Sequence, residues 1–250
     1  MFALPLPTPN EPARVIVGSK GGDAEVGLLE LAIIPDDREA WIYRPLVRAG
    51  WIMSLALFDF NHDGRTDVLV SDRKGSTRGI FWLEQPAEPA SEWPRHELGL
   101  AGREAMFLDL GDLDADGRAD IAAAAKGPEA IVLLRQPENV SEVWTSRELS
   151  LPPGYGGAKA VAIGDLDGDG RPDLAFTCEG ASGELRGAGW LRAPADPWSG
   201  DWEPHDISGP AGVKFDLIEL LDLDGDGDLD LLTCEERDNL GVIWYENPAK

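Results

Sequence analysis

The chain has 250 residues and a mass of 27.0 kDa, and 43% of its residues are hydrophobic. This apolar content, with nine Trp, is enough for a folded core and excludes a disordered chain. The balance of 22 Lys and Arg against 46 Asp and Glu gives a net charge of -24, which repels nucleic-acid phosphates and anionic bilayers. We expect no nucleic-acid partner. We also expect no membrane insertion, because no apolar run approaches the length of a spanning helix.

A repeat runs through the whole chain. Four acidic segments begin 53, 53 and 57 residues apart, at Asp59 (DFNHDGRTDVLV), Asp112 (DLDADGRADIAA), Asp165 (DLDGDGRPDLAF) and Asp222 (DLDGDGDLDLLT). One period before the first of them the chain reads LPTPNEPARVIV, which keeps the strand residues that follow the loop but lacks its acidic residues. The chain therefore contains five repeats, four of them with an acidic loop.

Two further signals each recur in four of the five repeats. One is a short apolar segment that ends in Pro, as in GIFWLEQP, AIVLLRQP, GAGWLRAP and GVIWYENP. The other is a Trp that leads into a polar-apolar segment, as in WIYRPL, WPRHEL, WTSREL and WEPHDI. Short apolar or alternating runs bounded by Gly, Pro, Asp and Ser are typical of strands, at about four strands per repeat.

Four-stranded repeats of this length predict an all-β protein, a β-propeller of about five four-stranded blades. We expect one domain over residues 1–250, with repeats at about 1–52, 53–105, 106–158, 159–215 and 216–250. Repeat 1 is expected to lack most of its first strand, and repeat 5 to end before its fourth. Phe2–Leu6 is expected to pair with the last blade and close the ring, since closure removes exposed sheet edges. The alternative is an open fragment of a larger propeller.

The acidic loops have the pattern D-x-D-x-D-G-x-x-D, whose positions we number 1 to 9. Side-chain oxygens stand at positions 1, 3, 5 and 9, a Gly allows a sharp turn at 6, and hard oxygens in this number suit Ca²⁺. An EF-hand loop closes instead with Glu at position 12 between helices. Asp-Gly clusters also form simple turns. Four such loops in register favour metal binding, because clustered carboxylates repel one another unless a cation neutralises them.

These loops and their spacing resemble the FG-GAP or VCBS repeat family, the calcium-loop propellers that include integrin α heads and many bacterial secreted proteins. The resemblance covers about Trp51 to Pro248 and implies about four structural Ca²⁺ ions. Asn61 replaces an Asp and is expected to weaken the first site, because it removes one charge. The resemblance implies these ligands: Asp59, Asn61, Asp63 and Asp67; Asp112, Asp114, Asp116 and Asp120; Asp165, Asp167, Asp169 and Asp173; Asp222, Asp224, Asp226 and Asp230.

In such a blade the acidic loop joins strands one and two, and the opposite end surrounds the mouth of a central channel. Every repeat has a charge six residues past the position that closes the loop, and most lysines fall in loops of the same face. We expect these residues to contact a ligand: Lys20, Arg73, Lys74, Arg103, Lys126, Glu179 and Glu236. Trp51 and Trp198 break the Trp pattern and are candidates for stacking on a sugar.

The family includes adhesins, lectins and some polysaccharide lyases, so the resemblance does not choose an activity. The first hypothesis is a calcium-stabilised module that binds a carbohydrate or a protein at the charged channel mouth. The alternative is a lyase or dehydratase acting on a uronate or keto-sugar, with a Lys base and carboxylates that place a proton or metal. The candidate catalytic residues are Lys159, Lys214, Asp109, Asp216 and Glu219, with Glu104 in the same set of loops.

We expect a secreted or periplasmic location, where millimolar Ca²⁺ fills weak loops. The first ten residues show no export-signal pattern. With only Cys178 and Cys234, a disulfide scaffold is excluded and the redox compartment stays open.

Overall fold

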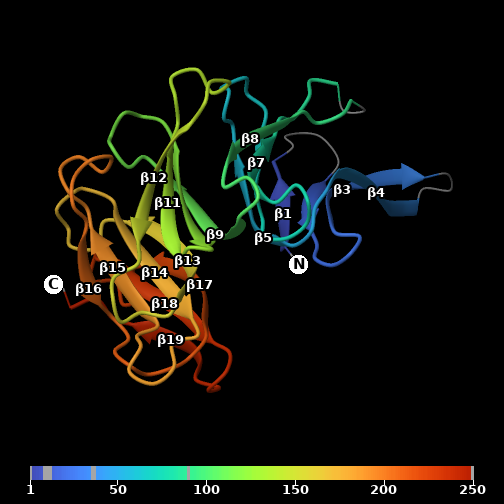
Figure 1. Ribbon diagram of the computed structural model, residues 1–250. Helices are drawn as coiled ribbons and strands as arrows, with labels where there is room; N and C mark the ends of the chain where they lie inside the picture. Colours follow the sequence, from blue (N-terminus) through green and yellow to red (C-terminus); the bar gives the residue numbers. More distant parts are fainter. Residues whose placement is uncertain (1, 8–12, 35–37, 89–90, 249–250) are drawn as a thin grey trace. The chain divides into compact units, whose positions relative to one another are not determined.

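The computed structural model describes residues 2–7, 13–34, 38–88 and 91–248, which form nineteen strands in five antiparallel sheets (Figure 1). The described residues include no helix with the length and apolar character that crossing a bilayer requires. The chain divides into two compact units, Met1–Ala105 with Asn139–Val143, and Met106–Glu138 with Trp144–Lys250. The all-β prediction is confirmed, and each sheet is a meander whose strands follow chain order.

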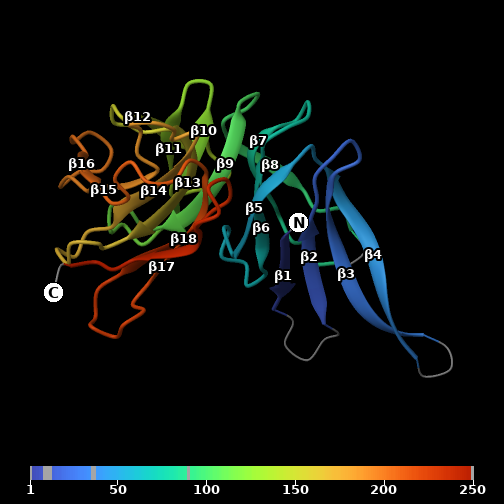
Figure 2. The ribbon, with the colours of Figure 1, turned by 90° about the horizontal axis from the view of Figure 1, so that it is seen from below.

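Unit 1 contains the first two sheets. The first consists of β1 (Phe2–Leu6), β2 (Arg14–Gly18), β3 (Glu25–Ile34) and β4 (Arg38–Arg48). The second consists of β5 (Ile52–Phe58), β6 (Asp67–Asp72), β7 (Gly79–Leu83) and β8 (Arg95–Gly99). The sheets share a core that includes Ile16, Val26, Val68, Phe81 and Trp93. The long β3–β4 hairpin extends past β1 and β2 (Figure 2).

Unit 2 contains the other three sheets, except that Glu104 and Ala105, at the start of the third sheet, belong to unit 1. The third is β9 (Glu104–Gly111), β10 (Asp120–Lys126), β11 (Ala130–Arg135) and β12 (Thr145–Ser150). The fourth is β13 (Gly157–Gly164), β14 (Asp173–Glu179), β15 (Ala188–Arg192) and β16 (Glu203–Asp206). The fifth is β17 (Phe215–Leu221), β18 (Asp230–Glu235) and β19 (Gly241–Tyr245). Within the described residues it has three strands, as expected for a repeat that ends before its fourth.

Consecutive sheets within each unit pack through their inner strands. β1 contacts β5 in unit 1, and in unit 2 β10 contacts β13 while β13 and β14 contact β17. The fourth sheet is therefore covered on one face by the third sheet and on the other by the fifth, which explains why β14 is a nearly continuous buried run rather than an alternating one. β6 and β10 are also nearly continuous buried runs. This is the packing of propeller blades. Closure of the five sheets into a ring stays a prediction.

The first sheet corrects one expectation. Phe2–Leu6 does not pair with the last sheet, and repeat 1 does not lack its first strand: these residues form β1 and pair antiparallel with β2, with Leu4 opposite Ile16. The prediction was wrong because β1 and β2 are separated only by residues 7–13. Closing that short loop costs less chain entropy than pairing with a strand near residue 245.

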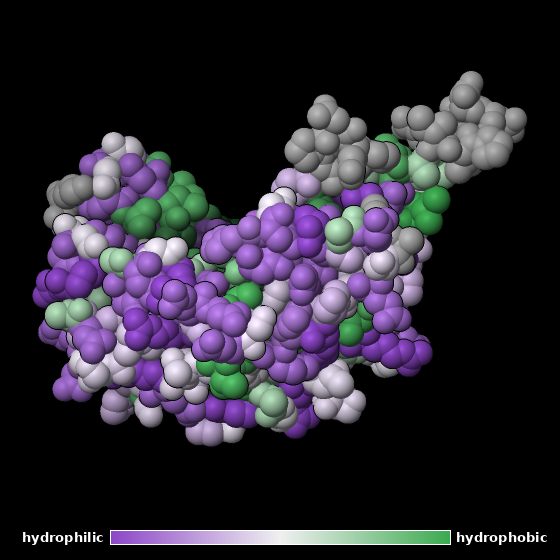
Figure 3. Space-filling model, turned by 90° about the horizontal axis from the view of Figure 1, so that it is seen from above, coloured by the Kyte–Doolittle hydropathy of each residue, from purple (hydrophilic) through white to green (hydrophobic). Residues whose placement is uncertain are grey.

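The face seen in Figure 3 is predominantly hydrophilic, with separate hydrophobic patches. This agrees with a chain in which 27% of the residues are charged. The larger exposed apolar side chains include Trp41 on β4 in unit 1 and Val242 and Trp244 on β19 in unit 2.

Candidate metal loops and charged clusters

Each acidic loop joins the first strand of a sheet to its second, as the repeat pattern predicts. Position 6 is Gly64, Gly117, Gly170 or Gly227, with φ between 84° and 95°. This left-handed backbone is readily adopted only by Gly, which explains the invariant residue within the four loops. The first carboxylate organises the turn: Asp112 Oδ1 accepts from the N–H of Asp116 at 3.1 Å, and its Oδ2 from Gly117 at 2.8 Å.

The closing Asp at position 9 ties the loop to the third strand. Buried Asp120 accepts hydrogen bonds from the N–H groups of Leu113 at 3.2 Å and Gln136 at 2.9 Å. Asp67, Asp173 and Asp230 accept the equivalent pairs from Phe60 and Gln85, Leu166 and Ala193, and Leu223 and Asn247. In each of these four sheets the closing Asp therefore holds the acidic loop against the end of the third strand.

Burial raises the pKa of Asp67 and of Asp120 to about 7, although two N–H groups oppose the shift in each case. Burial also raises the pKa of Asp173. At Asp230 burial acts in the same direction, but hydrogen bonds from Asn247, Leu223 and the Trp244 side chain lower the pKa. Burial makes the ionised form of the closing Asp unfavourable in three of these four sheets, and a nearby cation would offset that free-energy cost.

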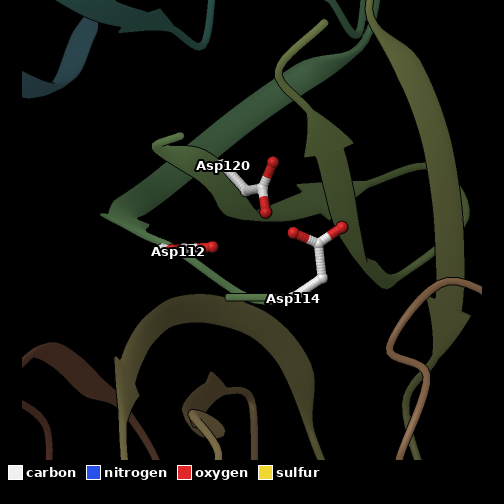
Figure 4. A group of neighbouring side chains, drawn as sticks. All are labelled: Asp112, Asp114 and Asp120. Atoms are coloured by element: carbon white, nitrogen blue, oxygen red, sulfur yellow. The ribbon is translucent and has the colours of Figure 1, made fainter. Parts of the chain in front are cut away.

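Carboxylates gather in three of the loops. Oxygens of Asp112, Asp114 and Asp120 lie within 4.8 Å of one another and point toward a common space (Figure 4). The same holds for Asp165, Asp167 and Asp173, and for Asp222, Asp224 and Asp226. Asp114 Oδ1 is buried and has no hydrogen-bond partner among the described residues. An all-oxygen donor set with an unpaired buried carboxylate oxygen fits a hard divalent cation such as Ca²⁺.

The residue at position 7 differs between the loops, and so does the part that position 5 plays in the gathered carboxylates. In the first three loops it is Arg65, Arg118 or Arg171, and each guanidinium forms an ion pair with the Asp at position 5. In the fourth loop position 7 is Asp228, so Asp226 at position 5 joins positions 1 and 3. Sequence reasoning took position 5 as a ligand in every loop and missed this competition.

The first loop differs from the others at position 3. Asn61 donates from Nδ2 to Glu84 Oε1 at 3.2 Å, and its Oδ1 accepts from the N–H of Asp63 at 3.1 Å. The loop therefore offers an amide oxygen where the other three loops have a carboxylate. This supports the expectation of a weaker cation site at Asp59, Asn61, Asp63 and Asp67.

Six predicted residues of unit 2 meet at the opposite ends of its strands, in a group that we call the lysine–carboxylate cluster. Glu179 on β14 binds Lys126 from β10 and Lys159 Nζ from β13, the latter at 3.2 Å. Lys159 Nζ also lies 3.4 Å from Asp216 Oδ1 on β17, and Lys214 pairs with Glu236. These six residues come from three consecutive sheets: Lys126, Lys159, Glu179, Lys214, Asp216 and Glu236.

The pKa values in the cluster follow from its pairing. Burial raises the pKa of Asp216 to about 6, and the neighbouring Glu236 carboxylate adds to the shift. At Glu179 burial also raises the pKa, but hydrogen bonds and charges from Lys126 and Lys159 lower it overall. The side chain of Lys159 is only 7% exposed, whereas those of Lys214 and Glu236 are 39% and 44% exposed. A ligand would therefore reach the cluster from the Lys214–Glu236 side.

Unit 1 contains a second charged group around Trp51. Lys20 Nζ lies 4.9 Å and the Arg73 guanidinium 5.2 Å from the centre of the Trp51 ring. Glu104 accepts from Arg73 Nε at 2.7 Å and pairs with Lys74. Burial opposes ionisation of Glu104, but hydrogen bonds from Lys74 and Arg73 lower its pKa to about 2. The Trp51 ring is thus already in contact with two cationic side chains of the protein, Lys20 and Arg73.

Other predicted residues lie outside these groups. Asp109 accepts from the N–H groups of Leu110 at 2.9 Å and Ile163 at 2.8 Å, so it ties β9 to β13. Glu219 is exposed on β17, and Arg103 lies in the turn before β9. Trp198 donates from Nε1 to Asp114 Oδ2 at 2.7 Å, which places it beside the second acidic loop.

Two buried carboxylates that sequence reasoning missed stand five residues past the closing Asp. Asp72 accepts from the N–H groups of Gly50, Trp51 and Lys74, at distances from 2.8 to 3.2 Å. Glu235 accepts from those of Val213, Lys214, Arg237 and Asp238. Burial opposes ionisation of Glu235, but these four donors lower its pKa to about 2. The sequence signal that could have identified these two residues was an acidic residue five positions past the closing Asp in two of the repeats.

Comparisons with known proteins point to one kind of repeat. Residues 112–176 match a family model described as FG-GAP-like repeat. The chain is 35% identical over 156 residues to integrin alpha-IIb of Mus musculus, and 33% identical over 159 residues to integrin alpha-IIb of Homo sapiens. Each match covers 52% of this chain but only 15% of the relative, so the chain spans a small part of the curated relatives it matches.

Proposed function

Because this chain carries FG-GAP-like repeats, we propose that it is a calcium-stabilised binding module whose ligand, a protein or a carbohydrate, contacts the lysine–carboxylate cluster. The observation that carries the proposal is the convergence of six charged side chains from three consecutive sheets. Charged residues at one end of a rigid sheet stack are pre-positioned to hydrogen-bond hydroxyl, amide or carboxylate groups. The exposed Lys214 and Glu236 are the first contacts for such a ligand.

Calcium has a structural role in this proposal. The gathered carboxylates in three loops support it, and the first loop would bind a fourth ion more weakly. Ions that bind only the folded chain stabilise it by mass action. We infer a secreted or periplasmic location for the same reason, since extracytoplasmic Ca²⁺ is high enough to fill weak loops.

The lyase or dehydratase alternative has less support. A Lys base needs an open path to the substrate, but Lys159 is 7% exposed and is shared by Glu179 and Asp216. Lys214 is more open, but it is paired with Glu236. The Asp109 carboxylate already accepts hydrogen bonds from two backbone N–H groups. A uronate panel with Lys159→Ala and Lys214→Ala variants tests this alternative by the appearance of an absorbing unsaturated product.

The binding proposal is tested on glycan and protein arrays in millimolar Ca²⁺. Wild type is expected to bind a defined class of ligand, Lys214→Ala to lose most of that binding, and the Lys214→Glu/Glu236→Lys exchange to alter selectivity while it keeps the ion pair. Glu203→Ala on exposed β16 is the matched control. Binding that is absent on both arrays, or equal in wild type and Lys214→Ala, would refute the assignment of this cluster.

A further inference from the structure

One residue of the fourth sheet reaches the acidic loop of the third sheet. Trp198, in the turn between β15 and β16, donates from its indole Nε1 to Asp114 Oδ2 at 2.7 Å. Arg135 at the end of β11 contacts the same oxygen from Nη2 at 2.6 Å, and its guanidinium lies 5.5 Å from the centre of the Trp198 ring. The carboxylate at position 3 of the second loop is therefore held through one oxygen by two donors, and only Arg135 belongs to its own sheet.

The hydrogen bonds inside the second loop differ from those of the other three loops. In those loops the side-chain Oδ1 at position 3 accepts from the backbone N–H at position 5, at 3.1 to 3.2 Å. The pairs are Asn61 with Asp63, Asp167 with Asp169, and Asp224 with Asp226. In the second loop Asp114 Oδ1 is buried and has no hydrogen-bond partner among the described residues. Trp198 and Arg135 thus hold Asp114 in an orientation that leaves one oxygen unpaired.

This unpaired oxygen belongs to a side chain that takes part in the gathered carboxylates. Asp114 offers an oxygen within 4.8 Å of oxygens of Asp112 and Asp120, and the three side chains point toward a common space (Figure 4). The Asp114 side chain is only 10% exposed, so a carboxylate oxygen without a donor is unfavourable there. A cation would supply the missing partner at Oδ1 while Oδ2 stays bonded to the indole. Trp198 adds no positive charge beside such an ion, in contrast to Arg135.

The turn that carries Trp198 is itself fixed to the third sheet. Asp196 Oδ1 accepts from the backbone N–H of Trp198 at 2.9 Å, and the carbonyl oxygen of Asp196 accepts from the N–H of Gly200 at 2.9 Å. Arg147 on β12 donates to the carbonyl oxygens of Pro197 at 2.7 Å and Gly200 at 2.6 Å. The position of the indole is therefore set by contacts on both sides, to Arg147 and to Asp114.

We propose that Trp198 is a positioning residue of the second cation loop. It acts through Asp114, which it holds with one oxygen available to Ca²⁺, so the cation site of the third sheet includes a residue of the fourth sheet. Outer residues that orient metal ligands typically change metal affinity by about 10- to 100-fold. Cation binding at this loop and docking of the Trp198 turn are consequently coupled, and each stabilises the other. The inference rests on the calcium role proposed above.

The opposite role, competition with the cation, gives an effect of opposite sign. A competing donor has to release Asp114 before the metal binds, so its removal raises the metal affinity. The geometry favours positioning, because Oδ1 is unpaired and a cation bound there leaves the bond between Trp198 and Oδ2 intact. The sign of the change in affinity therefore separates the two roles.

The test measures the Ca²⁺ affinity of single loops in the whole 250-residue chain by nuclear magnetic resonance. The amide signals of Gly117 and Gly170, at position 6 of the second and third loops, report the two sites separately in one titration. Trp198→Phe keeps an aromatic ring but removes the N–H donor. It is expected to weaken Ca²⁺ binding at the second loop about tenfold or more and to leave the third loop unchanged. In an Asp114→Asn background the same substitution is expected to have no further effect.

Trp202→Phe is the matched control. Trp202 Nε1 donates to the carbonyl oxygen of Pro197 at 3.2 Å, so this indole bonds the same turn rather than a loop carboxylate. We expect the control to leave the Ca²⁺ affinity reported by Gly117 largely unchanged. Hydrogen exchange gives a second readout: Ca²⁺ is expected to slow exchange of the Gly200 amide in wild type but not in Trp198→Phe.

Two results overturn the proposal: an unchanged or higher affinity of the second loop in Trp198→Phe, or an equal loss of affinity in Trp202→Phe, which assigns the effect to packing of the turn. If neither Gly117 nor Gly170 responds to Ca²⁺ in wild type, the calcium role fails together with this inference. If both respond and Trp198→Phe has no effect, only this inference fails.

Discussion

At the scale of single residues, the Arg at position 7 of each of the first three loops competes with the expected cation. Arg171 pairs with Asp169, while Arg192 reaches Asp167 at 2.6 Å and Asp169 at 3.3 Å. Desolvation opposes ionisation of Asp169 at position 5, but the hydrogen bond from the backbone N–H of Arg171 and the charges of both guanidinium groups lower its pKa. A cation must displace or share these contacts, so the Arg side chains reduce affinity for metal.

Arg171→Gln is therefore expected to raise the Ca²⁺ affinity of the third loop several-fold, because removing one competing charge leaves Asp169 freer to bind. Titration calorimetry measures the change. Arg186→Gln is the control, because it removes a guanidinium that pairs with Asp206 and with no residue of an acidic loop. We expect it to leave the Ca²⁺ affinity unchanged. Equal affinities in Arg171→Gln and wild type would show that the ion pair does not compete with the metal.

Glu235 is a second residue whose charge affects the stability of the fold. Its pKa falls from the ordinary 4.5 to about 2, because four backbone N–H groups stabilise the carboxylate against the opposing effect of burial. A carboxylate with a lowered folded-state pKa contributes stability that is fully present above pH 4.5. That contribution is lost as the pH falls toward 2.

Glu235→Gln is expected to lower the free energy of unfolding at pH 7 by about 1 to 3 kcal/mol, because the N–H groups lose a charged acceptor. It is also expected to flatten the acid dependence of stability between pH 4.5 and 2. Urea unfolding at pH 7 and at pH 3 measures both effects, with Glu203→Gln as the control. A variant that loses as much stability at pH 3 as at pH 7 would contradict this account of the charge.

At the scale of elements, the closing Asp connects the acidic loop to the end of the third strand whether or not it also binds a metal. Asp120 joins the loop residue Leu113 to Gln136 after the third strand, and the same three-part connection recurs in the second, fourth and fifth sheets. Without the carboxylate two buried N–H groups lose their acceptor. The strand corners therefore depend on this residue even when no cation is bound.

Asp120→Ala is expected to lower the free energy of unfolding by about 2 to 4 kcal/mol in EDTA, because the cost of unsatisfied buried donors does not require metal. Asp116→Ala, at position 5 of the same loop, is expected to have a much smaller effect in EDTA. Chemical unfolding of both variants provides the comparison. If the two variants lost stability only in Ca²⁺, the closing Asp would act through metal alone.

At the scale of the whole molecule, a buried thiol can report whether calcium stabilises unit 2. Cys178 on β14 of the fourth sheet is fully buried, and burial raises the pKa of its thiol to about 12. A protonated, inaccessible thiol reacts only when the structure opens. Its labelling rate therefore reports opening of unit 2.

Millimolar Ca²⁺ is expected to raise the melting temperature and to slow labelling of Cys178 by a thiol reagent, relative to EDTA, because the ion binds the folded chain and screens clustered carboxylates. Mg²⁺ at the same ionic strength is the control and is expected to have a smaller effect, since it prefers rigid octahedral sites. Labelling that is equally fast in Ca²⁺ and EDTA would rule out a structural role for calcium.

The single domain expected over residues 1–250 stays a prediction, since the chain divides into two compact units. A compact chain of this length has a radius of gyration of about 18 Å. We expect small-angle scattering in Ca²⁺ to give this value, with a single calorimetric transition. A clearly larger radius with two transitions would show that the units behave as separate domains.

The strands and loops could be predicted from the sequence because their causes are local. The short apolar run around Leu69, the Gly at position 6 and the Asp at position 1 act within a few residues, and the repeat multiplies the signal. The three-stranded fifth sheet and the location of each acidic loop between strands one and two followed from the same period. The sequence also placed charges at the strand ends where the lysine–carboxylate cluster forms.

Tertiary structure decided which of those charges meet and what they do. Lys159 and Asp216 are paired because β13 and β17 pack together, and Asp109 is bound by β13 rather than by a ligand. Ion pairs and buried hydrogen bonds between residues some 50 positions apart depend on how sheets stack, which no local pattern encodes. Phe2–Leu6 is the reverse case: a nearby partner was available in β2, and the lower entropy of a short loop decided its pairing.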